Sequence, residues 1–409
     1  MMGKRLRIAL VIESSRAYGR RVLAGINAYA RQHGPWAFYM EERETGEVPP
    51  PWLRSWKGDG IISRVDDVAL ARAIQHTHLP AVDLRGVVRS AMPVVKTDDR
   101  QVVKLAAEHL LARGFAHLAY CGFTDLSYSE RRLKHLLSIL HEREIPCSVY
   151  QTPPPRSNAP QREIERIGVL FNKELASWLR SLPKPVGVIA CNDIRGQQVL
   201  NTCREIDLIV PEQVAVIGVD NDDVLCELSD PPMSSVELDT HNAGYEAAAL
   251  LDRLIRGEPT PPGPILIPPK GVVCRRSTET LAIPDRHVAD AVRFIRLHAT
   301  EGIKVKQILA QIPMSRRLME RRFRKLLGHG PHAEITRVRI ERVKLLLVET
   351  DWPLDSIAIS TGFTGADYLS VAFKKHTGLC PGEFRRKHCK NDHVCRSKPT
   401  KRSLGPNGF

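Results

Sequence analysis

Short apolar runs alternate with amphipathic stretches along the first 280 residues, and this alternation limits the possible folds more than any other feature of the sequence. The apolar runs, which are typical of buried strands, lie at 6–13, 37–40, 60–63, 117–122, 186–190 and 214–219. The amphipathic stretches lie at 18–32, 102–113, 129–143, 163–180 and 194–205. Strands that alternate with helices form parallel sheets. Because the pattern occurs in two sets, we expect an α/β region with two parallel-sheet lobes at 1–280.

The pattern changes near residue 284, after a proline-rich stretch at 259–269. Beyond it the chain has helical periodicity, at 288–298, 305–312, 316–327, 332–349, 354–360 and 366–376. We therefore expect a linker with a docking helix at 281–302, an all-α domain at 303–390 and a disordered basic tail at 391–409. The helix at 288–298 has an apolar face made by Val288, Val292 and Ile295, so we expect it to dock on another domain or a second subunit.

Positive charge is concentrated in the C-terminal part of the chain. The formal net charge is +14, and residues 285–409 hold 25 Lys and Arg against 12 Asp and Glu, which leaves the preceding residues nearly neutral. Each Lys or Arg beside a phosphate releases condensed counterions, so a confined basic excess suits nucleic-acid binding. A solvated basic tail is the alternative.

The sequence predicts a cytoplasmic protein that does not span a membrane. An apolar run of about 18 residues, which a transmembrane helix needs, does not occur, and the apolar stretch at 8–12 is too short for a signal peptide. Nine cysteines without paired spacing are typical of a reducing compartment. The Cys/His cluster at 388–395 fits no familiar zinc spacing, so we expect neither a metal nor another cofactor.

A capped basic helix is predicted at 316–327. Ser315 is a good N-cap, Gly328 can end the helix, and Met319 and Phe323 lie on its apolar face. The opposite face carries Arg316, Arg317, Glu320, Arg321 and Arg324. A basic helix face of this width fits the DNA major groove and its flanking phosphates, although a solvated helix surface has the same pattern.

A second helix pair is predicted at 354–360 and 366–376, with a turn at Gly362 between them. We expect Tyr368, Leu369 and Phe373 to face the core. The outward positions of this pair are Thr364, Asp367, Ser370 and Lys374.

The two helix pairs and the helix between them resemble the AraC-type DNA-binding domain over 303–386. The resemblance rests on Ser315, Arg317, Met319, Arg321, Phe323, Leu345, Leu346, Ile357, Ala358, Gly362, Phe363, Tyr368, Phe373, Lys374, Lys375, Gly378, Pro381, Phe384 and Arg385. It implies two helix-turn-helix units that enter successive major grooves, with Arg316, Arg317, Glu320 and Arg321 at the first groove. Operator DNA and RNA polymerase are the partners it implies. Ala366 and Val371 depart from the family, which often has polar residues there, so DNA shape would contribute more at the second groove.

Polar side chains follow the predicted strands of the N-terminal region, at the ends where α/β proteins form clefts. Sugar recognition needs such groups, because charged side chains bind vicinal hydroxyls through paired hydrogen bonds. The candidates are Ser14, Ser15, Arg16, Arg131, Asn192, Asp193, Asp220 and Asn221. Two of them have a structural alternative, since Asp193 is placed to cap the helix at 194 and Asp220 to form an Asx-turn.

The N-terminal region resembles the LacI-type periplasmic-binding-protein fold over 6–277. The resemblance rests on the order of Thr97-Asp98, His117-Leu118-Ala119-Tyr120, Cys191-Asn192-Asp193, 211–220, Ser234-Ser235-Val236 and Gly244-Tyr245. It implies that one Arg and two Asp side chains bind a sugar, and it maps these roles onto Arg131, Asp193 and Asp220. The DNA-binding headpiece usual in that family does not precede the first predicted strand, which agrees with DNA binding at the C-terminal end.

The combination of both modules resembles a family of bacterial xylose-responsive regulators, on motifs that include Arg16-Ala17-Tyr18, 217–221, 275–278 and 294–299. The resemblance implies a sugar-responsive transcription regulator that activates pentose catabolic genes. Xylose or a similar monosaccharide would be the effector, and a homodimer the assembly.

Three other functions stay open at this point. An AraC-type regulator can respond to a different small molecule or to a partner protein. A transport-type binding protein would share the cleft but would need an export signal. An enzyme of sugar or nucleotide metabolism would need a Gly-rich phosphate loop, a dinucleotide fingerprint or a nucleophile elbow, and none occurs in the sequence, so we expect no enzymatic activity.

Overall fold

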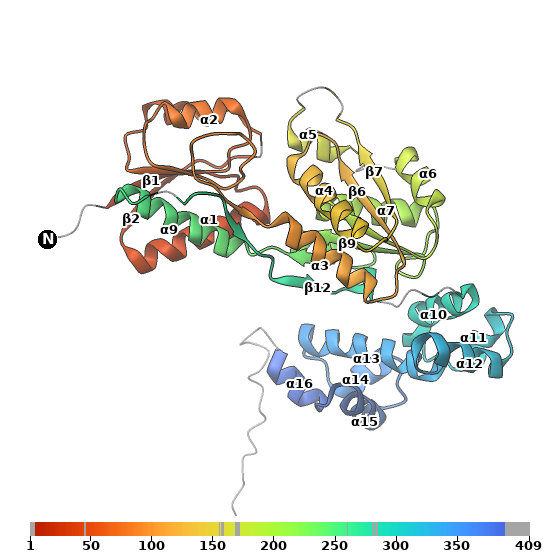
Figure 1. Ribbon diagram of the computed structural model, residues 1–409. Helices are drawn as coiled ribbons and strands as arrows, with labels where there is room; N and C mark the ends of the chain where they lie inside the picture. Colours follow the sequence, from red (N-terminus) through yellow and green to blue (C-terminus); the bar gives the residue numbers. More distant parts are fainter. Residues whose placement is uncertain are drawn as a thin grey trace, which may run out of the picture. The chain divides into compact units, whose positions relative to one another are not determined.

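The computed structural model describes residues 5–44, 46–154, 156, 159–167, 172–259, 261–279, 283 and 285–388. It forms two compact units, Met1–Ala282 and Ile283–Phe409 (Figure 1). Each unit is described by itself. The predicted basic tail at 391–409 lies outside the described residues.

The first lobe of the N-terminal unit is built on a parallel sheet of order β2-β1-β3-β4. Its strands are β1 (Leu6–Val11), β2 (Trp36–Met40), β3 (Gly60–Ser63) and β4 (Ala81–Asp83), with β5 (Val95–Thr97) and β11 (Ile265–Ile267) as a separate parallel pair. Its helices are α1 (Ala17–His33), α2 (Val68–Gln75), α9 (Thr240–Ile255) and the short η1 (Pro51–Ser55). Helices α1 and α9 approach closely because Gly25 and Gly244 have no Cβ, which would lie within about 2 Å of a backbone oxygen of the other helix.

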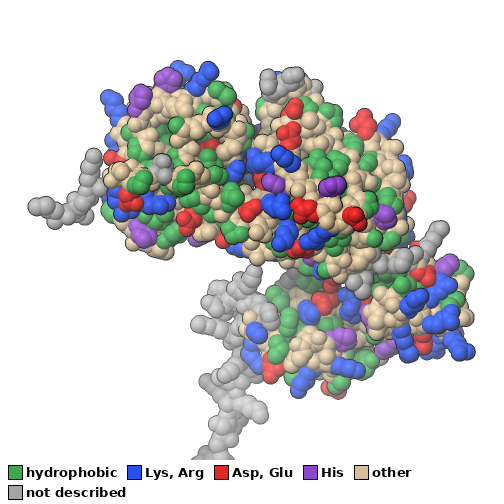
Figure 2. Space-filling view, in the orientation of Figure 1, with side chains coloured by type: hydrophobic (Ala, Val, Ile, Leu, Met, Phe, Trp, Pro, Cys, Tyr) green, Lys and Arg blue, Asp and Glu red, His purple; other side chains and the backbone are tan. Residues whose placement is uncertain are grey.

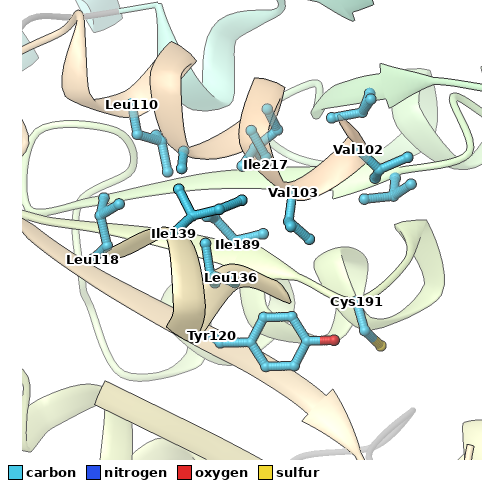
Figure 3. Close-up of a cluster of buried hydrophobic side chains, with 14 of the residues drawn as sticks. Val102, Val103, Leu110, Leu118, Tyr120, Leu136, Ile139, Ile189, Cys191 and Ile217 are labelled. Carbon is cyan, nitrogen blue, oxygen red and sulfur yellow. The ribbon is translucent and has the colours of Figure 1, made fainter. Parts of the chain in front are cut away.

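The second lobe is built on a six-stranded sheet of order β12-β10-β9-β8-β6-β7, parallel except for β12. Its strands are β6 (His117–Phe123), β7 (Cys147–Thr152), β8 (Val186–Ala190), β9 (Val214–Val219), β10 (Ser234–Glu237) and β12 (Gly271–Val273). Its helices are α3 (Asp99–Leu111), α4 (Ser127–His141), α5 (Gln161–Arg166), α6 (Lys173–Ser181), α7 (Asp193–Glu205), α8 (Asp223–Leu228) and η2 (Arg276–Thr278). Figure 3 shows the core of this lobe, where Val103 and Leu110 of α3 and Leu136 and Ile139 of α4 pack on the sheet.

The chain passes between the two lobes three times, from β5 to α3, from β10 to α9, and from β11 to β12. These crossings place strand ends of both lobes around one space, because parallel strands present their carboxyl ends at the same edge of a sheet. The predicted pair of parallel-sheet lobes followed by a helical unit is confirmed. The single amphipathic stretch expected at 163–180 is wrong, since α5 and α6 are separate helices there.

The C-terminal unit consists of helices around two hydrophobic clusters. They are α10 (Arg286–His298), η3 (Ala299–Glu301), α11 (Val305–Gln311), α12 (Arg316–Leu327), α13 (Pro331–Glu349), α14 (Leu354–Ser360), α15 (Ala366–Thr377) and α16 (Pro381–His388). The long helix α13 contributes Ile335 to the cluster with Met319 and Phe323, and Val343 to the cluster with Phe373. One continuous helix therefore joins the two helix-turn-helix units.

The apolar helix predicted at 288–298 packs against the helices that follow it in this unit. The apolar face of α10, with Val292 and Ile295 buried, packs against Ile308 of α11 and Phe323 of α12. Its N-cap Asp285 also accepts a hydrogen bond from Arg322 Nη1 at 2.7 Å. Residues of α11 and α12 cover this apolar face, so a second subunit is not required to bury it.

Candidate functional site

Side chains of both lobes of the N-terminal unit line a cleft with a volume of about 630 Å³ that includes its open mouth. Figure 2 shows Lys and Arg side chains along the groove between the lobes. The lining residues are Arg16, Tyr18, Arg64, Leu84, Arg85, Lys96, Thr97, Asp99, Tyr128, Arg131, Arg132, Gln161, Asn192 and Asp220.

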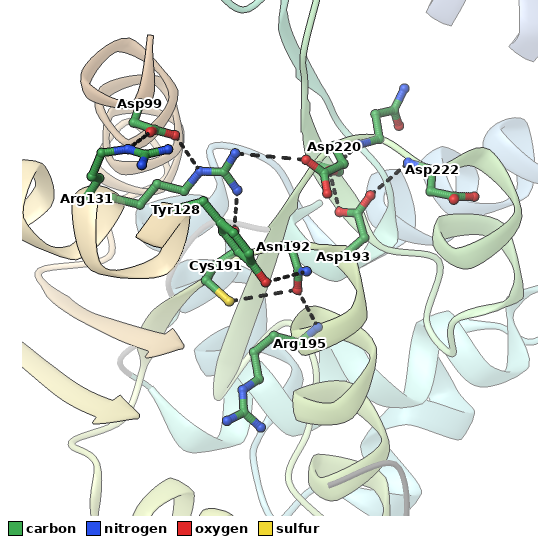
Figure 4. A network of polar contacts seen from close by, with 12 residues as sticks. Asp99, Tyr128, Arg131, Cys191, Asn192, Asp193, Arg195, Asp220 and Asp222 are labelled. Carbon is green, nitrogen blue, oxygen red and sulfur yellow. Dashed lines mark hydrogen bonds and ion pairs between the residues drawn. The ribbon is translucent and has the colours of Figure 1, made fainter. Parts of the chain in front are cut away.

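Two adjacent arginines of α4 share one carboxylate at the start of α3. Asp99 accepts hydrogen bonds from Arg131 Nε at 2.8 Å and from Arg132 Nε at 3.0 Å (Figure 4). The Arg132 guanidinium is buried, donates to the Cys191 carbonyl and lies 4.0 Å from Asp220 Oδ1. Arg131 is more exposed than Arg132. This arrangement holds guanidinium groups at the cleft with donors directed by fixed partners.

Asp220 follows β9 in a conformation that L-residues seldom adopt, with φ of 114°, and Asn221 follows with φ of 49°. Strained backbone of this kind persists where surrounding contacts fix it, and it gathers at binding sites. Here Asp220 N donates to Val236 O at 3.0 Å, and Asn221 N donates to Ser235 Oγ at 3.0 Å. The strand end and its neighbour β10 therefore hold the Asp220 carboxylate at the cleft.

Asp193 does not line the cleft but supports the loop that carries Asp220 (Figure 4). Its Oδ1 accepts a hydrogen bond from Ser235 Oγ at 2.6 Å, and its Oδ2 accepts one from Asp222 N at 2.8 Å. Burial raises the pKa of Asp193, and the charge of Asp220 raises it further. Burial also raises the pKa of Asp220, against the opposing charges of Arg132 and Arg16.

Asn192 takes the cleft position beside Asp193 and also caps α7. Its Oδ1 accepts the Arg195 backbone N–H at 2.9 Å, so Asn192 rather than Asp193 is the N-cap. Its amide donates to Tyr128 Oη at 3.1 Å and to Glu165 Oε1 at 3.2 Å. Glu165 also forms an ion pair with Arg16, which follows β1 in the other lobe. The buried carboxylate of Glu165 therefore connects Arg16 of the first lobe with Asn192 of the second.

The structure brings together some of the residues proposed from sequence and separates others. Arg16, Arg131, Asn192 and Asp220 line the cleft. The other candidates, Ser14, Ser15, Asp193 and Asn221, are not among the lining residues. Asn221 is buried, and its Oδ1 accepts a hydrogen bond from Arg275 at 2.9 Å.

Several lining residues were missed although the sequence carried a signal for them. Arg64 directly follows the predicted strand at 60–63, the same position that singled out Arg16 after the first strand. Arg132 shares a helix face with the buried Leu136 and Ile139, at the spacing of four and seven residues that marks an inward face. Its neighbour Arg131 lies about 100° around the helix and is more exposed.

The outward faces of α12 and α15 carry the candidate DNA-binding side chains. Arg316, Arg317, Arg321 and Arg324 of α12 are exposed, and Glu320 accepts a hydrogen bond from Arg316 Nε at 3.3 Å. In the second unit, Thr364, Asp367 and Lys374 are exposed, and Ser370 is half-buried. Tyr368 was expected in the core but is 49% exposed, because Leu369, Ala372 and Phe373 form the buried face of α15 and Tyr368 lies beside that face.

The two helix-turn-helix units are fixed to each other by close contacts. Arg339 of α13 donates hydrogen bonds to Ala299 O at 2.8 Å and Ile303 O at 3.0 Å, and its guanidinium lies over the Phe363 ring. Gly362 has φ of 75°, and a Cβ there would lie 2.8 Å from Gly302 N. The turn of the second unit therefore packs directly on the segment between η3 and α11, just ahead of the first unit, and this contact limits how α12 and α15 lie relative to each other.

The described residues contain neither a membrane-spanning helix nor a cluster of metal ligands. No described helix combines the length and hydrophobicity needed to cross a bilayer. Within the same residues, no group of three or more His, Cys, Asp and Glu side chains is arranged to hold a metal ion. Most of the Cys/His cluster at 388–395 lies outside the part of the chain that the structure describes.

Three family models match the chain in succession. A XylR N-terminal domain matches residues 7–100, a periplasmic binding protein-like domain matches residues 107–278, and a helix-turn-helix domain matches residues 308–387. A LacI-type regulator from Alkaliphilus metalliredigens in complex with D-xylulofuranose is 16% identical, with a TM-score of 0.54 over 68% of this chain and 100% of that chain, and shows the fold alone.

Relatives match the chain along nearly its whole length. The xylose operon regulatory protein of Escherichia coli K12 is 32% identical over 394 residues, which are 94% of this chain and 98% of the relative. The protein of that name from Haemophilus influenzae is 31% identical over 93% of this chain and 98% of its own length. The structure of the xylose-binding transcription activator xylR is 30% identical, with a TM-score of 0.78 over 95% of this chain and 100% of that one. The chain belongs to the xylose operon regulatory protein family, as a DNA-binding transcription regulator, not an enzyme, with a periplasmic-binding-protein-like sensor ahead of an AraC-type helix-turn-helix domain.

Proposed function

We propose that the chain activates pentose catabolic genes when a pentose, xylose or a sugar of its size, binds in the cleft. The observation that supports this most is the meeting of Arg16 from one lobe with Arg132, Asn192 and Asp220 from the other. Charged and amide groups that converge from two lobes bind adjacent hydroxyls and favour the closed arrangement of the lobes. Relatives at 31% and 32% identity are named for the xylose operon.

In this proposal the cleft residues have different roles. Asp220 and Arg132 form charge-assisted hydrogen bonds to the sugar, and Arg16, Arg131 and Asn192 add further donors and acceptors. Asp193, with both oxygens bound to Ser235 and the Asp222 backbone, positions Asp220 and does not touch the sugar.

Operator DNA is bound by α12 and α15, each in a major groove. The exposed arginines of α12 contact phosphates and base edges, and Thr364, Asp367, Ser370 and Lys374 contribute at the second groove. The exposed Val371, which is 69% accessible, offers apolar contact rather than a hydrogen bond, so shape would contribute to recognition there.

The assembly and location of the regulator follow from the same proposal. We infer a cytoplasmic homodimer that binds two half-sites and contacts RNA polymerase. A dimer is supported by the usual match between the symmetry of a regulator and its operator, and a cytoplasmic location by the DNA partner.

Operator binding should depend steeply on salt and on xylose. With an operator fragment selected by the full-length protein from random DNA, affinity is expected to fall about 10³-fold or more between 50 and 200 mM salt, because several phosphate contacts release counterions. Xylose should raise the affinity. Arg321→Ala should weaken binding and lower the salt slope by about one, whereas Arg293→Ala, an exposed arginine of α10, should change neither. Salt-independent binding, or identical affinity with and without every sugar of a pentose and hexose panel, would contradict the proposal.

A further inference from the structure

The short helix α5 belongs to the second lobe but also contacts the first. It lies between β7 and α6 along the chain, and the Gln198 amide of α7 donates a hydrogen bond to Glu165 O at 2.8 Å. The Glu165 side chain is buried and accepts a hydrogen bond from Tyr128 Oη of α4 at 2.7 Å. Because these partners lie in the second lobe, α5 moves with that lobe when the lobes separate.

Two contacts between α5 and the first lobe lie at the wall of the cleft. Glu165 pairs with Arg16, which comes after β1. Gln161 Oε1 accepts a hydrogen bond from Arg85 Nη2 at 2.6 Å, and both of these side chains line the cleft. Each contact joins two groups of the protein, so it does not depend on a sugar.

Two further contacts lie outside the lining of the cleft, at the loop that follows β2. Arg162 forms an ion pair with Glu44, and both side chains are partly exposed. Gly46 has φ of 83°, and a Cβ placed on it would lie 3.4 Å from Cβ of Pro160, the residue before α5. The loop of the first lobe and the start of α5 therefore approach each other closely.

We propose that residues 160–166 form a latch that holds the two lobes together before the sugar binds. This inference rests on the proposed function, in which the closed arrangement of the lobes binds the sugar and favours operator binding. Contacts that form only in the closed arrangement shift the equilibrium toward it by their own free energy. A partly exposed ion pair such as Arg162 with Glu44 contributes at most about 5-fold, and the contacts at the wall of the cleft add to it. The latch therefore raises the sugar affinity and also the operator affinity of the sugar-free protein.

A disulfide across the latch tests closure in the full-length protein without sugar or DNA. Gly46→Cys combined with Pro160→Cys places two thiols at a Cβ separation close to that of a disulfide. With diamide as the oxidant, peptide mass spectrometry should detect the 46–160 disulfide in the sugar-free protein. The locked protein should bind operator DNA at least several-fold tighter than its reduced form. Thiols at positions 46 and 160 that stay reduced without sugar would overturn the latch.

Charge reversal at the rim of the cleft gives a second measurement that does not alter Gly46. Arg162→Glu places a carboxylate against Glu44 and should weaken xylose binding by about 5-fold, as measured by calorimetry. Adding Glu44→Arg to this variant restores an ion pair with the charges exchanged and should restore the affinity. The matched control is Glu163→Arg, which breaks the ion pair of Glu163 with Arg156 at 2.9 Å on the same side of the cleft, within the second lobe, and should leave xylose affinity unchanged.

The outcomes separate the latch from the proposed function. Equal xylose affinity in Arg162→Glu and Glu163→Arg would overturn the latch and leave the sugar sensor standing, and so would an exchanged pair that does not restore the affinity. A locked protein that binds operator DNA no better than its reduced form would retain the latch and overturn the proposed link between closure and operator binding.

Discussion

Replacing Ile295 by Asp should abolish operator binding at every effector concentration. Ile295 is fully buried in α10, in the cluster that also contains Met319 and Phe323 of the first recognition helix. A carboxylate placed there without a partner should cost about 4 kcal/mol or more, which is a large part of the stability of a small helical domain. The sequence alone predicted only that the apolar face carrying Ile295 docks on another domain or a second subunit. The structure makes this substitution a change in the core of the DNA-binding unit.

The matched control is Leu297→Asp on the same helix. Leu297 is 59% exposed, so this change should shift stability by less than about 0.5 kcal/mol and leave operator binding intact. Thermal unfolding of both variants reports on the C-terminal unit, and calorimetric titration with sugar reports on the N-terminal unit. Ile295→Asp should lose the transition of the C-terminal unit and keep effector affinity. Normal operator affinity in Ile295→Asp would show that the packing of α10 has been misassigned.

Asp220→Asn should weaken effector binding by about 100-fold. The substitution keeps the size of the side chain and removes the charge that accepts hydrogen bonds from sugar hydroxyls, a loss of about 2 to 3 kcal/mol. Asp193→Asn should have a smaller effect, because Asp193 acts through the position of the Asp220 loop. The two variants therefore rank the residues that the sequence treated as equivalent.

An acidic residue near the same loop provides the control for this pair. Asp223 begins α8, and its side chain is 68% exposed, so Asp223→Asn should bind effector like the unmodified protein. Calorimetric titration with the sugar that binds tightest is the measurement. Equal affinity in Asp220→Asn and Asp223→Asn would remove Asp220 from the binding site.

The sequence located the ends of the strands well, because apolar runs of four to six residues stand out against their polar neighbours. Arg16 and Asp220 were found in this way, and both line the cleft. Asp193 is not among the lining residues, whereas its neighbour Asn192 is. At the start of a helix, adjacent side chains diverge by about 100°, so Asn192 faces the cleft and Asp193 turns toward Ser235. The position of a strand end therefore does not predict which of two adjacent side chains faces the cleft.

The sequence did not predict which elements far apart in the chain contact each other. Periodicity identified the apolar face of α10. It did not identify the residues of α11 and α12 that cover this face, because periodicity shows that a face is buried but not what buries it. Periodicity likewise did not show that α9, which follows most of the second lobe along the chain, packs on α1 of the first lobe. The lining of the cleft also depends on which strand ends meet, since the lining residues Arg64, Arg85 and Lys96 span more than 30 residues of the sequence.

A route from the cleft toward the end of the sensor passes through Asn221. Its side chain accepts a hydrogen bond from Arg275 Nη1 at 2.9 Å, and Arg275 also binds Met233 O at 3.0 Å and Glu227. Arg275 directly precedes η2, which lies close to the end of the N-terminal unit. A ligand that moves Asp220 therefore acts on a residue one position away from this contact. We expect the segment around Arg275 to transmit effector binding.

Effector binding and operator binding are linked in one molecule, and sugar titration with and without operator DNA measures this linkage. Linkage requires that each ligand change the affinity for the other by the same factor. We expect operator DNA to tighten sugar binding by the factor by which sugar tightens operator binding, and we expect Arg275→Ala to reduce this factor. Superimposable sugar titration curves with and without operator DNA, for a protein that binds both, would contradict it.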